Sequence, residues 1–142
     1  MTKTVLCALD INRPEDAHVL KEAARFAALD DAQLDVITVV PDYGASVVGA
    51  YFEDHHVKTA RDDAKRLLAE FCLAAVGAER NASIRHVISI GKVYEEVLKA
   101  AKHDKADLIV IGAHSPDLKD YLLGPNAARV VRHAKSSVYV VR

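Results

Sequence analysis

Five short apolar runs alternate with four amphipathic segments along this 142-residue chain. The runs are rich in β-branched residues, which is typical of strands buried on both faces of a parallel sheet. The segments between them repeat apolar residues at helical spacing. This alternation predicts one α/β domain over residues 1–142, doubly wound, with a five-stranded parallel sheet and helices on both faces. The expected strands are Val5–Leu9, Leu34–Val40, Ser83–Ile90, Asp107–Ile111 and Ser137–Val141.

The helices expected between these strands have recognisable starts and apolar faces. Asn12 can cap the first helix, because Glu15 follows three residues later and completes a capping box. The last helix is expected to bury Ala128, Val130 and Val131. The expected helices are one that follows Asn12 and fades at Leu29, then about Val57–Val76, Val93–Lys102 and Pro125–His133.

Composition and charge exclude several classes of partner. Lys plus Arg number 19 and Asp plus Glu number 20, so the formal net charge is -1. A chain so balanced gives no reason to expect a nucleic acid or an anionic membrane as partner. No apolar run approaches the roughly 20 residues that a transmembrane helix needs. We therefore expect neither partner.

The cysteines and the N-terminal residues indicate a cytoplasmic location. Cys7 and Cys72 lie inside apolar segments and lack the spacing of metal ligands, so each is expected to be a buried free thiol. Free thiols are usual in a reducing compartment. The first four residues lead directly into a strand-like run without the apolar segment of a signal peptide.

Three strand ends are candidates for a ligand site, because α/β folds bind ligands at the carboxyl ends of their strands. Ala8 and Asp10 end the first strand, Val39 lies near the end of the second, and Gly112 ends the fourth. If the first and fourth strands are neighbours, Asp10 faces the loop after Gly112. Its carboxylate then has two possible roles. It either accepts hydrogen bonds from a ribose hydroxyl or an adenine amine, or it only caps or hydrogen-bonds the backbone of the turn that follows it.

The loop after Gly112 ends at a helix that begins with Gly124, Pro125 and Asn126. A loop that runs from a strand to a helix N-terminus can bind an anion. The common phosphate-binding motifs are absent, however: neither G-x-x-x-x-G-K-[ST] nor G-x-G-x-x-G occurs. No nucleophile has an obvious base partner, and no carboxylate pair is evident, so the residues do not indicate an enzyme. His55 and His56 would need further ligands to bind a metal, and we interpret them as solvated.

Several motifs together resemble the universal stress protein family over the full length of the chain. They are Gly112-Ala113-His114, the segment Tyr121-Leu122-Leu123-Gly124-Pro125-Asn126-Ala127, and the C-terminal Val130-Val131-Arg132-His133-Ala134 followed by Ser137-Val138-Tyr139-Val140-Val141. The segment around Tyr121 is similar to that of small single-domain bacterial members with a shortened glycine loop.

The resemblance implies strand order 3-2-1-4-5, a homodimer, and a regulatory adenine nucleotide, ATP, ADP or AMP, turned over slowly or not at all. It implies that Asp10, beside Ala8, holds the adenosine part and that the Val39 backbone contacts adenine. Ribose and phosphates would lie against the loop and helix start, formed by Gly112, His114, Ser115, Gly124, Pro125 and Asn126. The protein itself requires no metal, although Mg²⁺ could accompany ATP.

This sequence departs from the family pattern at the phosphate end. The family has Gly, two residues, Gly, nine residues, Gly, then Ser or Thr. Here Ser115 replaces the second Gly, eight residues precede Gly124, and Pro125 replaces the Ser or Thr. Proline has neither a hydroxyl nor an N–H to offer a phosphate. We therefore expect weakened or altered phosphate binding, and as the alternative a nucleotide-independent module that recognises a regulatory protein partner through the apolar residues of 47–52.

The last strand gives the dimer an independent physical reason. Val138, Tyr139, Val140 and Val141 are apolar on both faces of a strand that should lie at an edge of the sheet. Edge strands with unpaired N–H and C=O groups invite pairing with another chain. We expect a second copy to pair there, unless the segment 43–56 covers the edge.

Overall fold

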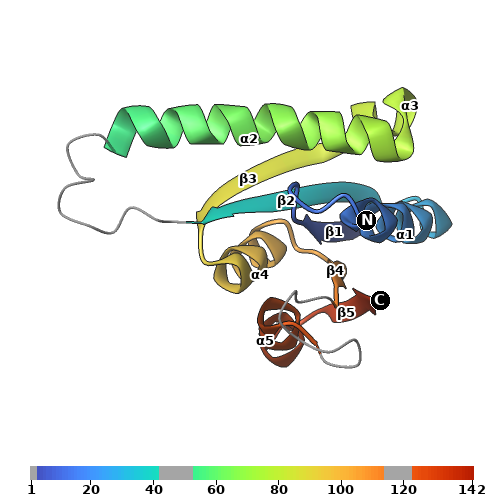
Figure 1. The fold of residues 1–142 in the computed structure, drawn as a ribbon. Helices are drawn as coiled ribbons and strands as arrows, with labels where there is room; N and C mark the ends of the chain where they lie inside the picture. The colour runs from blue at the N-terminus through green and yellow to red at the C-terminus, as the bar shows by residue number, and fades with distance from the viewer. Residues whose placement is uncertain (1–2, 42–52, 114–122) are drawn as a thin grey trace.

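The structure is a computed structural model that describes residues 3–41, 53–113 and 123–142. Strands and helices alternate as the sequence predicts, except that a short unpredicted helix, α3, directly follows α2 (Figure 1). The elements are β1 (Thr4–Leu9), α1 (Asp16–Leu29), β2 (Gln33–Pro41), α2 (Glu53–Val76), α3 (Ala78–Ser83), β3 (Arg85–Gly91), α4 (Val93–His103), β4 (Leu108–Gly112), α5 (Pro125–His133) and β5 (Ser137–Val141).

The five strands form one parallel sheet in the order β3-β2-β1-β4-β5, which confirms the expected order. β1 is central and pairs on one side with β2, where Cys7 lies opposite Val36. On its other side it pairs with β4, where Cys7 lies opposite Val110. The carboxyl ends of β1 and β4 are therefore neighbours.

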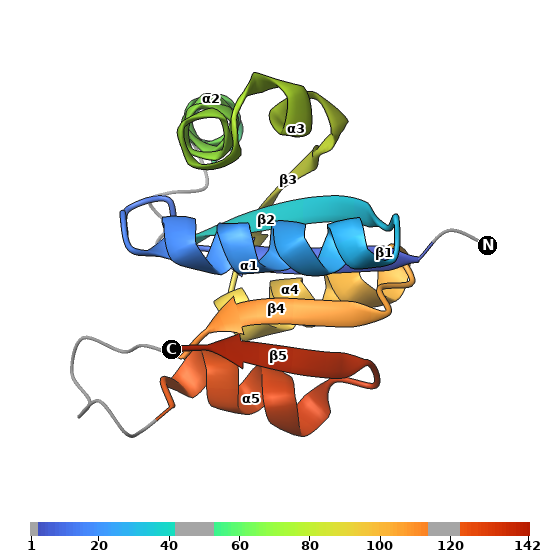
Figure 2. The same ribbon diagram turned by 90° about the vertical axis from the view of Figure 1, so that its right-hand side faces the viewer.

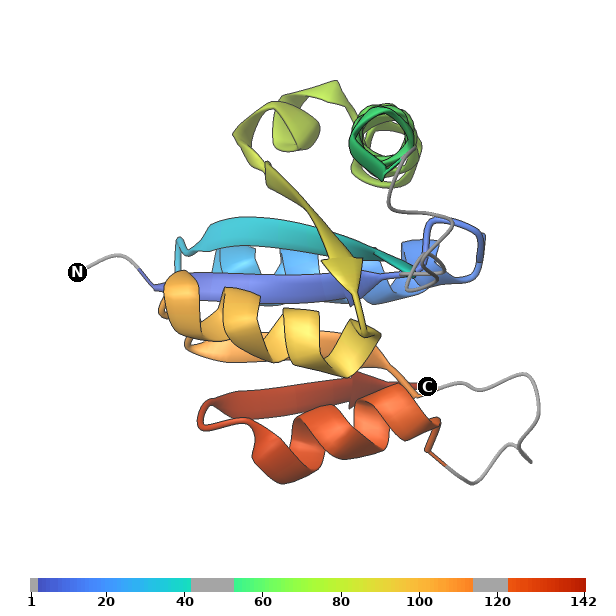
Figure 3. The same ribbon diagram turned by 90° about the vertical axis from the view of Figure 1, so that its left-hand side faces the viewer.

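Helices cover both faces of the sheet, and each face has its own core. Figure 3 shows α4 and α5 in front of the strands, whereas Figure 2 shows α1 in front of them. Successive residues of β1 point to opposite faces. Val5, Cys7 and Leu9 pack with α1 and α2, and Leu6 and Ala8 pack with α4 and α5. Burial of β1 on both faces explains its uninterrupted apolar sequence.

The thiols of Cys7 and Cys72 are free and buried, as expected. Burial raises the pKa of the Cys7 thiol well above its ordinary value. Burial likewise raises the pKa of Cys72 to about 11. Within the described residues, no helix is both long and apolar enough to cross a membrane.

The predicted capping box at the first helix is wrong. α1 begins at Asp16, after turns in which Asp16 N–H donates to the Arg13 carbonyl and Arg13 N–H to the Asp10 carbonyl, both at 3.0 Å. Asn12 caps nothing; its own N–H donates to Asp10 Oδ1 at 2.9 Å. The chain needs these turns to leave β1 and reverse over the sheet, so the helix starts later than local sequence suggests.

Other differences concern where the helices begin and end and which residues of α5 face the sheet. α2 begins at Glu53 rather than near Val57, and α3 ends at Ser83, where a strand was expected to begin. α5 has the predicted bounds but buries Ala127 and Val130, leaving Ala128 exposed and Val131 46% exposed. Apolar residues occur in α5 as two adjacent pairs, Ala127-Ala128 and Val130-Val131, separated by Arg129, so the sequence alone does not determine which member of each pair faces the sheet.

Two buried carboxyl groups meet at the end of the sheet opposite the carboxyl ends of the strands. Asp35 in β2 is 2% exposed, and the side chain of Asp104, just after α4, is 4% exposed. Asp104 Oδ1 contacts His103 at 2.8 Å and Arg85 at 3.4 Å, but its buried Oδ2 has no donor. Burial, then the neighbouring Asp104, raises the pKa of Asp35 to about 6. A proton on Asp35 supplies the donor that Asp104 Oδ2 lacks.

The carboxyl pair makes stability depend on pH. Burial of Asp104 opposes its ionisation, but hydrogen bonding from Asp35 and His103 and the charge of Arg85 outweigh this and lower its pKa. The Asp104 contribution is thus present above its ordinary pKa of 3.8 and is lost as the pH falls below it. Because the pKa of Asp35 is raised, its contribution is present below 3.8 and is lost as the pH rises through about 6.

We predict that Asp35→Asn makes the protein relatively more stable at alkaline pH. Burial lowers the pKa of His86, which adds stability as the pH rises past 6.5 and masks part of the Asp35 loss in the wild type. The difference in free energy of unfolding between variant and wild type, from urea titrations, should therefore shift in favour of the variant by up to about 2 kcal/mol between pH 4.5 and pH 7.5. Asp30→Asn, at a surface carboxylate paired with Lys3, is the control and should show no such shift. Parallel pH profiles for the wild type and Asp35→Asn would contradict the prediction.

Candidate functional site

The candidate site lies where the sheet connections change direction. From β1 the chain goes to β2 and β3 on one side, and it then crosses to β4 and β5 on the other. The loops leaving β1 and β4 consequently run to helices on opposite faces of the sheet, and a crevice opens between them. This places residues after Leu9 beside residues after Ile111.

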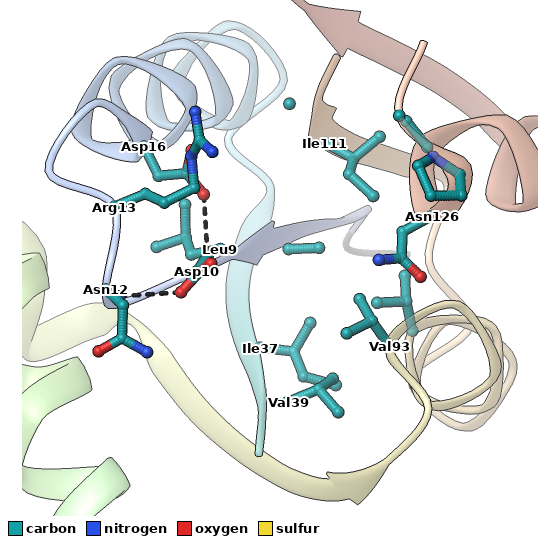
Figure 4. Close-up of a pocket in the computed structure, with 16 residues that line it drawn as sticks. Leu9, Asp10, Asn12, Arg13, Asp16, Ile37, Val39, Val93, Ile111 and Asn126 are labelled. Atoms are coloured by element: carbon teal, nitrogen blue, oxygen red, sulfur yellow. Dashed lines mark hydrogen bonds between the residues drawn. The ribbon is translucent and has the colours of Figure 1, made fainter. Parts of the chain in front are cut away.

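A cavity of about 490 Å³ occupies this crevice (Figure 4). Its volume is within the range of about 300–1,000 Å³ typical of small-molecule sites. β1, β2, β4, α4, α5 and the turn between β1 and α1 all contribute to its wall. The lining residues are Ala8, Leu9, Asp10, Asn12, Arg13, Asp16, Ile37, Val39, Val93, Val97, Ile111, Gly112, Gly124, Pro125, Asn126 and Ala127.

One part of the wall is apolar. Ile37 and Val39 lie on the same side of β2, and Figure 4 shows them next to Val93, the first residue of α4. Ile37 and Val97 belong to the buried core of this face, while Val39 is partly exposed. A flat aromatic group can displace water from such a surface.

Asp10 dominates the polar wall on the side of β1. Its backbone N–H donates to Asp16 Oδ2 at 2.8 Å, and its Oδ1 accepts the Asn12 N–H at 2.9 Å. Asp16, the first residue of α1, is 3% exposed. Its buried carboxylate therefore stabilises the turn between β1 and α1 by accepting the Asp10 N–H. Asp10 therefore bonds its own turn through one oxygen and also lines the cavity; the two interpretations of this residue are compatible.

The opposite polar wall is the N-terminus of α5. Gly124 N–H donates to the Ala113 carbonyl at 2.8 Å, and Ala113 N–H donates to the Val141 carbonyl at 2.8 Å. Both of these N–H groups are therefore engaged, and Pro125, the first residue of α5, has none. The first N–H groups of a helix have no acceptor within it. Asn126 and Ala127 are thus the residues whose N–H groups can meet an anion here.

The structure brings together most of the residues that the sequence singled out. Seven of them line the one cavity, contributed by β1, β2, β4 and α5: Ala8, Asp10, Val39, Gly112, Gly124, Pro125 and Asn126. His114 and Ser115 lie outside the described residues, as does the apolar segment 47–52. In the part of the chain that is described, no three His, Cys, Asp or Glu residues are grouped to hold a metal ion.

The sequence reasoning missed Asn12 and Arg13 on the polar wall and Ile37, Val93 and Val97 on the apolar wall. Asn12 and Arg13 could have been found, because the rule that selected Asp10 applies to the whole loop after that strand. Nothing in the sequence marks the apolar residues as part of a site, since their pattern is typical of ordinary core positions.

Comparison with known proteins places this architecture in a family. The model of the universal stress protein family matches residues 1–142. Universal stress protein A homolog 1 of Coxiella burnetii is 32% identical over 98% of this chain and 95% of its own length. Universal stress protein G of Escherichia coli O157:H7 is 28% identical, with both chains covered completely.

Solved structures share the fold. A universal stress protein in complex with cAMP superposes with a TM-score of 0.69 at 21% identity, covering 99% of this chain and 97% of the other. The universal stress protein from Archaeoglobus fulgidus in complex with dAMP gives a TM-score of 0.61 at 19% identity, covering 99% and 98%. With the family model matched along the whole sequence, this chain belongs to the universal stress protein family.

Proposed function

We propose that this universal stress protein binds an adenine nucleotide in the cavity between β1 and β4 as a regulatory ligand in the cytoplasm. The observation that carries the proposal is the cavity itself, which joins an apolar wall, the Asp10 carboxylate and the N-terminus of α5. These three surfaces match the base, the ribose and the phosphate of a nucleotide. The nucleotide is assigned a regulatory role, with slow turnover or none.

Each wall has the chemistry for its part of the ligand. Val39 and Ile37 offer an apolar surface to the adenine ring. Among the described residues, the one side-chain hydrogen bond of Asp10 uses Oδ1, so Oδ2 can accept a ribose hydroxyl or an adenine amine. Asn126 and Ala127 can donate backbone N–H groups to a phosphate oxygen, where the positive end of the helix dipole also favours an anion.

Relatives support the choice of an adenine nucleotide. Two proteins of the same fold have been solved with cAMP and with dAMP, which share the adenine base and a phosphate. Pro125 and the engaged N–H of Gly124 reduce the donors at α5, however, and this supports altered phosphate binding. The same observation favours the alternative, a nucleotide-independent module that recognises a regulatory protein.

Calorimetric titration with ATP, ADP and AMP tests the proposal. We expect saturable binding of at least one of them by the wild type, and about 10- to 100-fold weaker binding by Asp10→Asn, because the variant loses a charged acceptor. Asparagine keeps an oxygen for the Asn12 N–H, so the turn should survive. The matched control is Asp30→Asn, at a surface position paired with Lys3. No heat with any of the three nucleotides at millimolar concentration would favour the alternative.

A second prediction concerns the helix start. Pro125→Ser adds an N–H and a hydroxyl at the first position of α5. If the missing donors weaken phosphate binding, the variant should bind ATP several-fold more tightly while its affinity for adenosine stays the same. An ATP affinity equal to that of the wild type would show that Pro125 does not limit binding.

We also propose a homodimer formed through β5. β5 lies at an edge of the sheet and pairs with β4 alone among the described strands. The Val141 carbonyl accepts a hydrogen bond from Ala113, on the β4 side. N–H and C=O of one strand residue point the same way, and adjacent residues point oppositely, so Val140 directs its polar backbone groups to the open edge. Pairing with Val138–Val141 of a second copy would satisfy them.

We predict that Val140→Pro makes the protein monomeric. Proline removes an N–H at the open edge without removing a hydrogen bond to β4, so the monomer should remain folded. Light scattering should give twice the monomer mass for the wild type and the monomer mass for the variant. Val140→Thr, which keeps the N–H and the β-branched shape, is the control and should stay dimeric. A monomeric wild type at micromolar concentration would refute the dimer.

A further inference from the structure

The charges around the cavity are unfavourable for an anionic ligand except at one residue. Asp10 and Asp16 are acidic, and Arg13 is the one Lys or Arg among the described lining residues. A nucleotide brings further negative charge into this partly enclosed space. Burying like charges together without a counter-charge costs free energy. Arg13 is therefore the described lining residue that can supply the positive counter-charge.

The backbone of Arg13 is held firmly in the turn between β1 and α1. Its N–H donates to the Asp10 carbonyl, and its carbonyl accepts the Asp16 N–H, both at 3.0 Å. Figure 4 shows the Arg13 side chain extending from the turn toward Asp16 and α1, on the side of the cavity across from Asn126. Pro14 follows and restricts the backbone of Arg13 further. A side chain on such a fixed support reaches a ligand with little loss of backbone entropy.

Among the described residues, the guanidinium of Arg13 has few partners. Its side chain is 27% exposed, and its Nε lies 4.0 Å from the carboxylate of Glu15, which is 73% exposed. Its Nε is buried without a hydrogen-bond acceptor. Buried donors of a charged group are normally satisfied, because leaving such a donor without an acceptor destabilises the protein. The unused donors of Arg13 point to an acceptor that a ligand would bring.

Phosphate is the group that fits these donors. The fork of a guanidinium matches two phosphate oxygens at once, and its charge does not titrate. At the other wall, Asn126 and Ala127 offer backbone N–H groups whereas Pro125 and Gly124 offer none, so a cationic contact from the β1 side would add to these two donors. We propose that Arg13 binds the phosphate of the nucleotide and so determines the preference of this site for a nucleotide over a nucleoside. This inference rests on the proposed function.

Titrations of adenosine and AMP without divalent cations test this inference. Four proteins are compared by calorimetry: the wild type, Arg13→Gln, Arg13→Lys, and Arg66→Gln, a control with the same charge change as Arg13→Gln on the exposed surface of α2. The wild type and Arg66→Gln should bind AMP about 10- to 100-fold more tightly than adenosine. Arg13→Gln should bind adenosine as the wild type does but lose most of the preference for AMP. Arg13→Lys should keep part of it, since a lysine retains the charge without the fork.

The outcomes separate the two proposals. A preference for AMP that survives in Arg13→Gln overturns the role of Arg13 and leaves nucleotide binding intact, and so does a wild type that never distinguishes AMP from adenosine. If the wild type binds neither, the proposed function fails, and titration with inorganic pyrophosphate decides on Arg13 alone. Pyrophosphate binding that is lost in Arg13→Gln and kept in Arg66→Gln supports the inference; no pyrophosphate binding by the wild type overturns it. Thermal unfolding should show that all four proteins are folded.

Discussion

The parallel pairing of β1 with β4 is the contact on which the site depends. Thr4 and Asp107 begin it, although they lie 103 positions apart: the Thr4 N–H donates to Asp107 Oδ2 and the Asp107 N–H to the Thr4 carbonyl, both at 2.8 Å. The register then runs from Val5 opposite Leu108 to Ala8 opposite Ile111. Because parallel strands end at the same edge, this pairing brings the turn after β1 beside the loop after β4. Without it there would be no crevice.

The two ends of the sheet handle buried carboxylates differently. At the carboxyl ends, Asp16 Oδ2 accepts the Asp10 N–H and Asp10 Oδ1 accepts the Asn12 N–H, so both carboxylates hold the turn beside the cavity. At the opposite end, Asp35 and Asp104 have too few donors for two charges, and one proton between them removes the conflict. The first arrangement leaves room for a ligand; the second is closed and affects stability alone.

Much of the fold followed from local pattern and family resemblance. β5 and α5 have the predicted bounds, because apolar runs and proline mark them clearly. The errors arose where tertiary packing overrides local preference. Asn12 has the chemistry of a helix cap, yet the chain needs turns there to reverse over the sheet, and Asp10 takes its N–H. In α5, Val130 rather than Val131 faces the sheet, a choice that two adjacent valines leave open.

The sequence by itself determined the fold class and the positions of Asp10, Gly112 and Pro125 at the ends of strands and at the start of a helix, because hydrophobic period and helix-start residues are local properties. The tertiary structure decided which side chains share the cavity with them. Val93 is distant in sequence from most of the site, and its place there depends on how α4 packs on the sheet. The direction of a side chain and the donors left unused around it are set by packing, which no short stretch of sequence specifies.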